Sequence, residues 1–385
     1  MDQFKILYRD SKSKARAGIL STPHGSIETP VFMPVGTQGT IKTLTSDEVN
    51  DLGFRIILGN TYHLFLRPGL ETIKKAGGLQ KFMSWRHSIL TDSGGYQVFS
   101  LATRCKMTEK GVEFSSYVDG TKCELSPETT TSFQLDIGSD VAMCLDVCPP
   151  FPSLKCDAKD SMERTWRWAK RCKETYQDWL VEKFPDKEQP RPLLFGITQG
   201  ASFPDLRRDS AKQTAQIDFP GYSIGGLGLG EPRKLTWELL EASLEPLPLS
   251  APHYLMGFGT PEDIWEGVER GVDMFDCVLP TRNGRSGQAF VSAGRINISN
   301  ADFKEDFSTL DPSCECACCR NYSRSYLCHL FRAGELLAPR LLTLHNLHFM
   351  ISLLRKIRLS IIQGSFLQEK KKYLDGLCEK EKIYS

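Results

Sequence analysis

The sequence lacks an excess of charge of either sign. It has 48 lysines and arginines against 47 aspartates and glutamates, a formal net charge of +1 over 385 residues. No overall field therefore attracts the chain to nucleic acid or to a membrane, so any polyanion must be bound by a local basic patch. Hydrophobic residues at 40% and charged residues at 25% are typical of a globular protein with a substantial core.

Long hydrophobic runs are also missing. No stretch approaches the roughly 18 uncharged apolar residues of a membrane span, and the charged start from Met1 to Asp10 does not fit a signal peptide. The 13 cysteines are an odd number in a long chain, which argues against a disulfide framework. We therefore expect a cytoplasmic protein with reduced thiols and no membrane contact.

The chain does contain short apolar runs that end on a glycine or a polar residue. Such continuous runs are typical of strands buried on both faces, as in parallel sheets. Helix-start signals separate several of them, since Thr45 to Glu48 has the form of a capping box and Ser126 and Thr260 each precede a proline. Eight runs predict a (β/α)8 barrel, with an open doubly wound sheet as the alternative. The runs are 30–36, 55–60, 88–92, 140–146, 192–199, 221–226, 253–258 and 272–278.

Segments outside these units predict additions to the barrel. Residues 4–28 predict antiparallel strands over one barrel end, and 111–120 predict a small hairpin between the third and fourth strands. Helical periodicity covers 341–362, and the lysine and glutamate mixture from Glu369 predicts a frayed tail. The expected organisation is a catalytic barrel at 1–310, a zinc-binding subdomain at 311–365 and a lysine- and glutamate-rich tail at 366–385.

A cysteine cluster with a C-x-C-x-x-C spacing stands at Cys314-Glu-Cys316-Ala-Cys318-Cys319. With His345 downstream, three thiolates and one imidazole make a closed tetrahedral set, as in structural zinc sites. Cys318 is an additional cysteine and His348 a competing histidine, so spacing alone leaves the ligand choice open. The alternative is a group of free thiols or a redox pair, which so tight a cluster disfavours. We expect one structural Zn²⁺ per chain.

The strand ends of a (β/α)8 barrel meet on one face, where such barrels carry their active sites. Here the ends supply three carboxylates, an amide, an exposed glycine backbone and a thioether, namely Asp92, Asp146, Asp276, Gln199, Gly226 and Met256. This set suits a flat polar heterocycle, whose two faces Tyr96 and Met256 can cover. Two of the acids allow nucleophilic and general acid–base work at a glycosidic carbon. Taken singly, each residue could equally be a helix cap, a turn former or a core residue.

Two neighbouring loops offer groups for a polyanion. Glycines stand at a helix N-terminus, which suits a phosphate oxygen, in Gly257-Phe258-Gly259-Thr260-Pro261-Glu262-Asp263. Two arginines stand close to Asp276 in Thr281-Arg282-Asn283-Gly284-Arg285. They form a local basic patch on a neutral protein, which fits a polyanionic substrate.

Five stretches carry a family resemblance: Ile89-Leu-Thr-Asp92-Ser93-Gly94-Gly95-Tyr96-Gln-Val, Phe195-Gly-Ile-Thr-Gln199-Gly, Gly225-Gly226-Leu227, His253-Tyr-Leu-Met256-Gly and Asp273-Met-Phe-Asp276-Cys-Val-Leu-Pro-Thr-Arg282. Together with the cysteine cluster, over about residues 4–365, they resemble bacterial tRNA-guanine transglycosylases. The resemblance implies a zinc-bearing (β/α)8 barrel, a glycosyltransferase of queuosine tRNA modification. Such an enzyme exchanges guanine at the wobble position of GUN-anticodon tRNAs for a 7-deazaguanine base.

The resemblance also implies residue roles. Asp276 corresponds to the nucleophile at the ribose anomeric carbon and Asp92 to the general acid–base, the proton acceptor. The substrate-binding residues would be Asp92, Ser93, Gly94, Gly95, Tyr96, Asp146, Gln199, Gly226, Leu227 and Met256. The loops 257–263 and 281–285 would contact the anticodon stem-loop of tRNA. The zinc ligands would be Cys314, Cys316, Cys319 and His345, with Cys318 as the extra thiol, and two copies would form a homodimer.

The implied chemistry is consistent with elementary requirements. A covalent ribosyl–aspartate ester stores the glycosidic bond, so exchange needs neither ATP nor a redox cofactor. Guanine is a poor leaving group unless protonated, water must be excluded, and the nucleotide must flip out of the anticodon stack.

One position departs from the family. Val147 stands where bacterial members usually carry a glutamate close to the exocyclic aminomethyl group of the precursor base, while Glu231 retains the other acid of that network. The incoming base is therefore open between the aminomethyl precursor and queuine. Two alternative functions are a barrel nucleosidase or glycosidase that uses water, and a non-catalytic RNA-binding subunit. The first has no use for Arg282, Arg285 or the zinc module, and the second would be expected to lose the pocket residues.

Overall fold

The computed structural model describes residues 3–101, 105–184 and 190–384. Eight parallel strands close into a barrel in the order β10-β11-β12-β13-β14-β4-β5-β6. This closure confirms the (β/α)8 prediction and excludes the open sheet. The strands are β4 (Val31–Gly36), β5 (Ile56–Gly59), β6 (Ser88–Thr91), β10 (Val141–Met143), β11 (Leu193–Thr198), β12 (Tyr222–Ile224), β13 (His253–Leu255) and β14 (Met274–Cys277).

Each of the eight expected apolar runs contains one barrel strand, because both faces of these strands are buried. One face fills the barrel interior with side chains such as Met33, Leu90 and Phe195, and the other packs against the helices. The surrounding helices are α1 (Ser46–Leu52), α2 (Thr61–Leu66), α3 (Leu70–Lys75), α4 (Leu79–Met83), α5 (Gly95–Leu101), α6 (Pro127–Asp136), α7 (Lys155–Lys183), α8 (Pro204–Ala215), α9 (Arg233–Leu244), α10 (Pro261–Glu269) and α11 (Leu279–Arg285).

The expected helix starts are present. Thr45 caps α1 and exchanges hydrogen bonds with Glu48, so the predicted capping box is confirmed. Ser126 caps α6 and Thr260 caps α10, each followed by proline at the first helical position. These caps fix where each helix leaves the barrel face that carries the strand ends.

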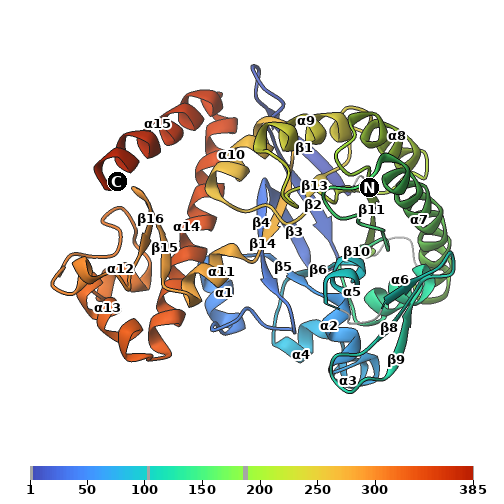
Figure 1. Ribbon diagram of the computed structural model, residues 1–385, viewed down its shortest axis with the longest axis horizontal. Coiled ribbons are helices and arrows are strands. Elements are labelled where there is room, and N and C mark those ends of the chain that lie inside the picture. The colour runs from blue at the N-terminus through green and yellow to red at the C-terminus, as the bar shows by residue number, and fades with distance from the viewer. Residues whose placement is uncertain (1–2, 102–104, 185–189, 385) are drawn as a thin grey trace.

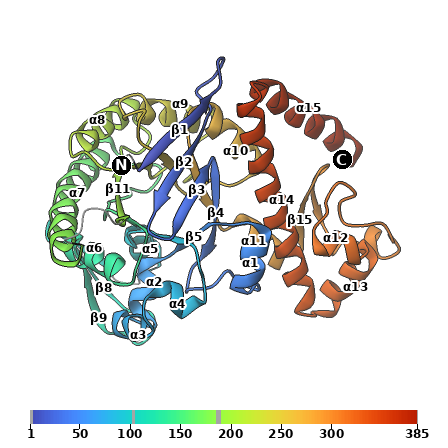
Figure 2. The same ribbon diagram turned by 180° about the vertical axis from the view of Figure 1, so that it is seen from behind.

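Three antiparallel strands cover the opposite barrel end, as the sequence predicts. They are β1 (Phe4–Arg9), β2 (Arg16–Thr22) and β3 (Gly25–Thr29), which lie in front of the barrel in Figure 2. Phe4, Leu20 and Ile27 join the core of the barrel interior, so this sheet closes the barrel floor and leaves the other end open for ligands.

Two expectations are corrected. The insertion between the third and fourth barrel strands is a three-stranded sheet and not a small hairpin, because the segment at 105–107 pairs as well. Its strands are β7 (Cys105–Met107), β8 (Val112–Ser115) and β9 (Lys122–Leu125). The tail is not frayed from Glu369 onward: it forms α15 (Phe366–Tyr384), and buried Phe366 and half-buried Tyr373 pack on Trp265 of α10. Met1, Asp2 and Ser385 lie outside the described residues.

The module that carries the cysteine cluster lies beside the barrel in Figure 1, across the long helix α14 (Leu337–Ile362). Its own core runs from Ala289 to Leu342 and so includes residues before the boundary expected at 310, which stays a prediction. The module contains β15 (Gln288–Val291), β16 (Gly294–Asn297), a 3-10 turn (Ala301–Phe303), α12 (Ala317–Asn321) and α13 (Arg324–Ala333). Among the described residues, no helix has the length and apolar character needed to cross a membrane.

Candidate active site and metal centre

Asp92 directly follows β6 and is almost fully buried. Its carboxylate accepts hydrogen bonds from Asn60 Nδ2 at 2.5 Å, the Thr61 amide at 2.9 Å and Gln97 Nε2 at 2.8 Å. Burial raises the pKa of Asp92 to about 6; the three donors offset part of this effect, and the charge of Asp276 adds to it. Asp92 can therefore hold or release a proton near neutral pH, as a general acid–base must.

Asp276 lies within β14, the strand that closes the barrel against β4. The Tyr254 hydroxyl donates to its Oδ1 at 2.6 Å, and the Gly257 amide donates to the same oxygen at 2.8 Å. Burial raises the pKa of Asp276, and these two donors partly oppose the rise. Because both bonds fall on Oδ1, the orientation of the carboxylate is fixed while Oδ2 faces no donor among the described residues.

Asp146 and Gln199 form a polar pair at the ends of β10 and β11. Gln199 Nε2 donates to Asp146 Oδ2 at 2.7 Å, and the Ser93 hydroxyl donates to Asp146 Oδ1 at 3.1 Å. Burial raises the pKa of Asp146 despite these bonds. The Gln199 Oε1 atom is buried without a hydrogen-bond partner. Because an unpaired buried acceptor is costly, it indicates a ligand donor at this place.

Glycines let the backbone approach this pair. A Cβ on Gly226 would lie 2.5 Å from Gln199 Oε1, and Gly226 has φ +66°. A Cβ on Gly95 would lie 2.8 Å from the carbonyl oxygen of Asp146. The buried Arg207 guanidinium donates to the Gly225 and Gly226 carbonyls at 2.6 and 2.7 Å. Burial lowers the pKa of Arg207 to about 10, so it stays charged at neutral pH and fixes this turn.

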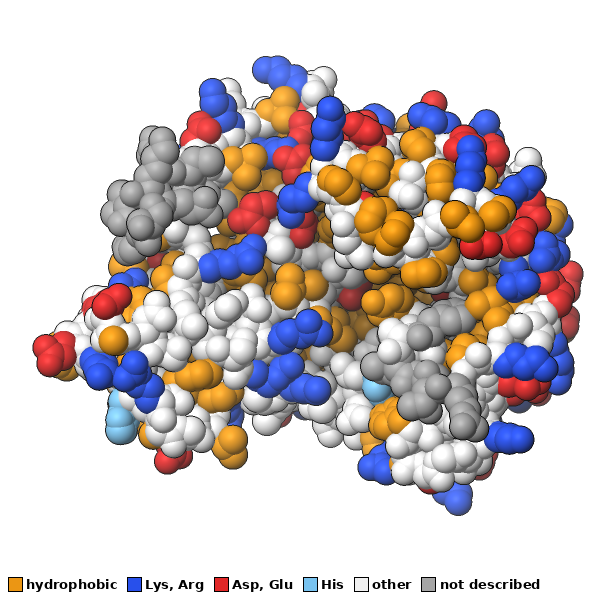
Figure 3. All heavy atoms as spheres, in the orientation of Figure 1, with side chains coloured by type: hydrophobic (Ala, Val, Ile, Leu, Met, Phe, Trp, Pro, Cys, Tyr) orange, Lys and Arg blue, Asp and Glu red, His pale blue; other side chains and the backbone are white. Residues whose placement is uncertain are grey.

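The remaining expected base-site residues differ in exposure. Leu227 is buried, and the ligand contact expected of its backbone stays a prediction. Met256 is half-buried and packs on the barrel interior, whereas Tyr96 has 51% of its side chain exposed on α5. Figure 3 shows a hollow over this open barrel end, with acidic and hydrophobic side chains inside it.

The loop 257–263 uses several of its polar groups within the chain. The Gly257 amide contacts Asp276, and Thr260 and Asp263 cap each other at the start of α10. Glu262 pairs with Arg295 at 3.5 Å and Asp263 with Arg233 at 2.6 Å. The first turn of α10 carries two acids, Glu262 and Asp263, which weaken the attraction of this helix N-terminus for a phosphate. The RNA contact expected for 257–263 stays a prediction.

The segment 281–285 forms most of α11. Thr281, Asn283 and Gly284 are buried, and a Cβ on Gly284 would lie 2.6 Å from the Thr343 amide nitrogen of α14. Arg282 is exposed and Arg285 half-buried, and the Arg285 Nη1 atom has no hydrogen-bond partner. Within this segment, the two arginines are therefore the side chains available to a polyanion, while the others attach α11 to α14.

The predicted zinc ligands come together. The ligand atoms of Cys314, Cys316, Cys319 and His345 lie within 4.8 Å of one another. His345 Nδ1 lies 3.6, 3.5 and 3.3 Å from the three sulfurs, close to the edge of about 3.6 Å expected for a tetrahedron with Zn–S near 2.3 Å and Zn–N near 2.05 Å. The His345 Nε2 atom bonds to the Phe290 carbonyl, which directs Nδ1 to the sulfurs.

The two competing residues lie outside this group. Cys318 is buried in the module core, and His348 Nδ1 contacts only the Cys314 sulfur, at 3.3 Å. The donor set therefore fits one metal ion with four protein ligands. The other cysteines that the structure describes are free thiols, as the sequence predicts.

Sequence reasoning missed the residues that hold the two central carboxylates. Asn60 directly follows β5 and Tyr254 lies in β13, so the rule used for Asp92 could have found Asn60. Gln97 stands within a stretch that carried the resemblance, but nothing there indicates a bond to Asp92. Arg207 gave no signal, since it lies on a helix distant in sequence from the turn it holds.

Val147 and Glu231 take different positions relative to the site. Val147 is buried between the barrel and its helices, and its amide donates to Thr165 Oγ1 of α7 at 2.9 Å. Glu231 accepts from the amides of Gly228 and Leu229 at 2.6 and 3.0 Å. Burial opposes ionisation of Glu231, but these bonds hold its pKa below the usual value. A carboxylate therefore remains next to the Gly226–Leu227 turn.

The sequences of known proteins match this chain over nearly its whole length. The family model described as queuine tRNA-ribosyltransferase matches residues 10–377. Proteins named queuine tRNA-ribosyltransferase include one from Caldanaerobacter subterraneus subsp. tengcongensis, 53% identical over 372 residues, which are 97% of this chain and 96% of the relative. Those of Thermoanaerobacter pseudethanolicus and Pelotomaculum thermopropionicum are each 50% identical, over 98% and 96% of this chain and 98% and 97% of their own lengths. With its closed barrel, its buried acids and its Cys₃His cluster, the chain belongs to the queuine tRNA-ribosyltransferase family.

Proposed function

We propose that the protein is a tRNA-guanine transglycosylase that exchanges guanine at the wobble position of GUN-anticodon tRNAs for a 7-deazaguanine base. The observation that carries this proposal is the pair of buried carboxylates, Asp92 and Asp276, whose charges interact at the open barrel end. Family membership supports the RNA substrate.

In the first half of the reaction, Asp276 Oδ2 attacks the anomeric carbon of the ribose. The bond from that carbon to guanine breaks, and its electron pair leaves with the guanine, to which protonated Asp92 gives a proton. Because Tyr254 and Gly257 hold Oδ1, the attacking oxygen needs no reorientation. The product is a ribosyl ester of Asp276.

In the second half, the Asp92 carboxylate takes the ring N–H proton of the incoming deazaguanine. The freed nitrogen attacks the anomeric carbon and displaces the Asp276 carboxylate, so the enzyme returns to its starting state. A single proton shuttles through Asp92 in both halves, which suits a pKa of about 6. No external oxidant or energy source is required.

The polar groups next to the acids fit the edge of a guanine-like base. Asp146 can accept from its amide and amino N–H groups, and the unpartnered Gln199 Oε1 supplies another acceptor. The Gly226 backbone lies against the same pair. Tyr96 and Met256 would cover the two faces of the base. Ser93, Gly94 and Gly95 complete this binding loop.

The Cys₃His cluster fits a structural Zn²⁺, which would be bound by Cys314, Cys316, Cys319 and His345. All four positions are supplied by the protein, so the ion would cross-link α12 and α14. It would stabilise the module, and the acids at the barrel mouth perform the chemistry without it.

The experiment that tests the function is exchange of radiolabelled guanine into an unmodified tRNA, with each candidate deazaguanine then offered as a competitor. Incorporation of label supports a transglycosylase. Guanine release without incorporation would indicate a nucleosidase that uses water. Tight tRNA binding without either reaction would indicate a non-catalytic subunit, although that subunit would have kept both acids assembled.

We also propose that two copies form a homodimer through the zinc-binding module. Large apolar side chains are exposed there: Phe307 79%, Tyr326 40%, Leu336 85% and Leu337 37%. Apolar groups gathered on one module are typical of a protein interface. Sedimentation of the wild type and of a Tyr326→Lys variant tests this, since the variant should shift toward the monomer.

A further inference from the structure

A cavity of about 900 Å³ lies between α14, α15 and the zinc-binding module, away from Asp92 and Asp276. Phe349, Ser352, Leu353 and Lys356 form its α14 wall, one face of that helix by their spacing. The α15 wall carries Gln368, Lys371, Lys372, Tyr373 and Asp375. A cavity of this size can take a ligand the size of a nucleotide; we call it the α14–α15 cleft.

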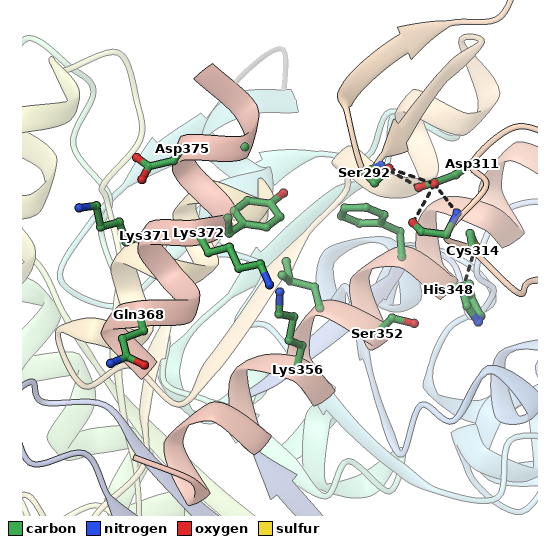
Figure 4. A pocket seen from close by; sticks show the side chains of 15 residues that line it. Ser292, Asp311, Cys314, His348, Ser352, Lys356, Gln368, Lys371, Lys372 and Asp375 are labelled. Atoms are coloured by element: carbon green, nitrogen blue, oxygen red, sulfur yellow. Dashed lines mark hydrogen bonds between the residues drawn. The ribbon is translucent and has the colours of Figure 1, made fainter. Parts of the chain in front are cut away.

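Ammonium groups from both walls meet in this cleft. Figure 4 shows the side chains of Lys356 and Lys372 pointing toward one another, with Lys371 at the outer rim near Asp375. Lys356 pairs with Glu369 at 2.9 Å, and the charge of Lys372 also acts on Glu369. Lys356 and Lys372 therefore share the charge of Glu369, while Lys371 has Asp375 beside it on the α15 wall.

The acid on the opposite wall, Asp311, is held by hydrogen bonds within the zinc-binding module. Asp311 is 1% exposed and accepts hydrogen bonds from Ser292 and Ser313, at 2.7 to 3.1 Å. Its charge is thus engaged by the module itself. The amines of the cleft lysines can contact an anionic group, and the aromatic rings of Phe349 and Tyr373 line the same cleft. Amines beside aromatic faces are the groups that bind a nucleotide, through its phosphate and its base.

The cleft adjoins the loop that contacts Asp276. Tyr373 packs on Trp265 of α10 with ring centroids 6.0 Å apart. The charges of Glu262 and Arg295 both act on the pKa of its hydroxyl group, so these residues lie near it. Glu262 belongs to the loop 257–263, whose Gly257 amide donates to Asp276. Figure 3 shows Lys and Arg side chains between the central hollow and this edge of the molecule. A strand leaving the barrel mouth could therefore reach the cleft.

We propose that the α14–α15 cleft binds a nucleotide of the tRNA substrate outside the anticodon loop, with Lys371 and Lys372 contacting its phosphates. The proposal rests on the proposed function, because it assumes a bound tRNA. It assigns to α15 a role that the sequence did not reveal.

The test compares Lys371→Gln/Lys372→Gln with a control that also removes two lysine charges, Lys183→Gln/Lys212→Gln. Lys183 and Lys212 stand in the last turns of α7 and α8, hence toward the barrel end opposite the active site. For each protein, the affinity for full-length tRNA is measured between low and high salt, together with kcat and KM for guanine exchange. Binding is measured independently of exchange, so a failure of the proposed function is distinguishable.

Each lost phosphate contact should reduce the salt slope by about 0.9 and weaken binding roughly 5-fold near 0.15 M salt. We therefore expect the Lys371/Lys372 variant to bind tRNA about 25-fold more weakly, with a higher KM, an unchanged kcat and a normal control. Affinity and salt slope equal to those of the control would overturn the proposal. So would competition by free nucleotide without loss of tRNA affinity, or a shift of the variant from dimer to monomer, which would assign the cleft to a second copy.

Discussion

Asp92→Asn should stabilise the fold while it stops exchange. Burial raises the pKa of the Asp92 carboxyl from an ordinary 3.8 to about 6. The folded protein therefore holds this proton more tightly than the unfolded chain does. Above pH 6 the carboxylate is ionised in both states, so the folded state is disfavoured by about 3 kcal/mol, from 2.2 pKa units at 1.36 kcal/mol each. Below pH 3.8 the penalty vanishes.

The neighbouring side chains can accept the new amide. Asn60, Thr61 and Gln97 donate to Asp92, and an amide keeps only one acceptor oxygen. The Gln97 Oε1 atom is buried without a partner, so rotation of its amide would turn that oxygen toward the new N–H group. Asn60 donates to the same carboxylate oxygen as Gln97, so its amide must rotate as well to present an acceptor to the new N–H group.

The assay is urea unfolding of the wild type, Asp92→Asn and a control, Asp209→Asn, at pH 5 and pH 8. Asp209 is exposed on α8. The stability advantage of Asp92→Asn should grow by about 1 kcal/mol between pH 5 and pH 8, since the folded wild type loses its proton in that interval. The control should follow the wild type. An advantage that stays constant with pH, or that shrinks as pH rises, would refute this reasoning.

Three further predictions concern the metal, the RNA and the incoming base. Cys316→Ala should lower bound zinc and stability together, because the site and the module fold together, whereas Cys318→Ala should keep the metal; a metal-free protein with unchanged melting would contradict this. Arg282→Ala and Arg285→Ala should each weaken tRNA binding and reduce by about 1 the slope of log affinity against log salt concentration. An unchanged slope would show that the arginine packs within the protein and does not contact a phosphate. Val147→Glu should shift the preference for the incoming base from queuine toward the aminomethyl base by about ten-fold, since a hydrogen bond to a charged group is worth about 1.5–3 kcal/mol. Equal selectivity of the two proteins in competition kinetics would show that Val147 does not affect the choice of base.

The sequence predicted the barrel because all eight strands are buried on both faces and leave apolar runs. It predicted that Asp92 and Asp276 lie near each other because residues at strand ends share one face of a barrel, and their charges do interact. The predicted grouping of Cys314, Cys316 and Cys319 is present in the structure, because metal ligands close in sequence restrict each other's geometry. Local sequence thus determined the parts that depend on local spacing.

The rest depended on contacts between distant segments. Arg207 holds the Gly225–Gly226 carbonyls from another helix, and no periodicity records that bond. The tail forms a helix because Lys370, which reads as a solvated charge, pairs with Glu266 and Glu269 of α10. At the start of α10, Asp263 exchanges hydrogen bonds with Thr260 as its cap partner, a contact that the glycine pattern of 257–263 did not indicate.

The most direct measurement is trapping of the covalent adduct between the enzyme and tRNA, without an incoming base, on a denaturing gel. The wild type should give a denaturation-resistant band that disappears when a deazaguanine is added. Asp276→Asn should give no band and lose exchange by roughly 10³-fold or more, with unfolding that matches a folded protein. A variant that traps adduct at the wild-type level would contradict the account and would place the nucleophile on another carboxylate, with Asp92 the first candidate.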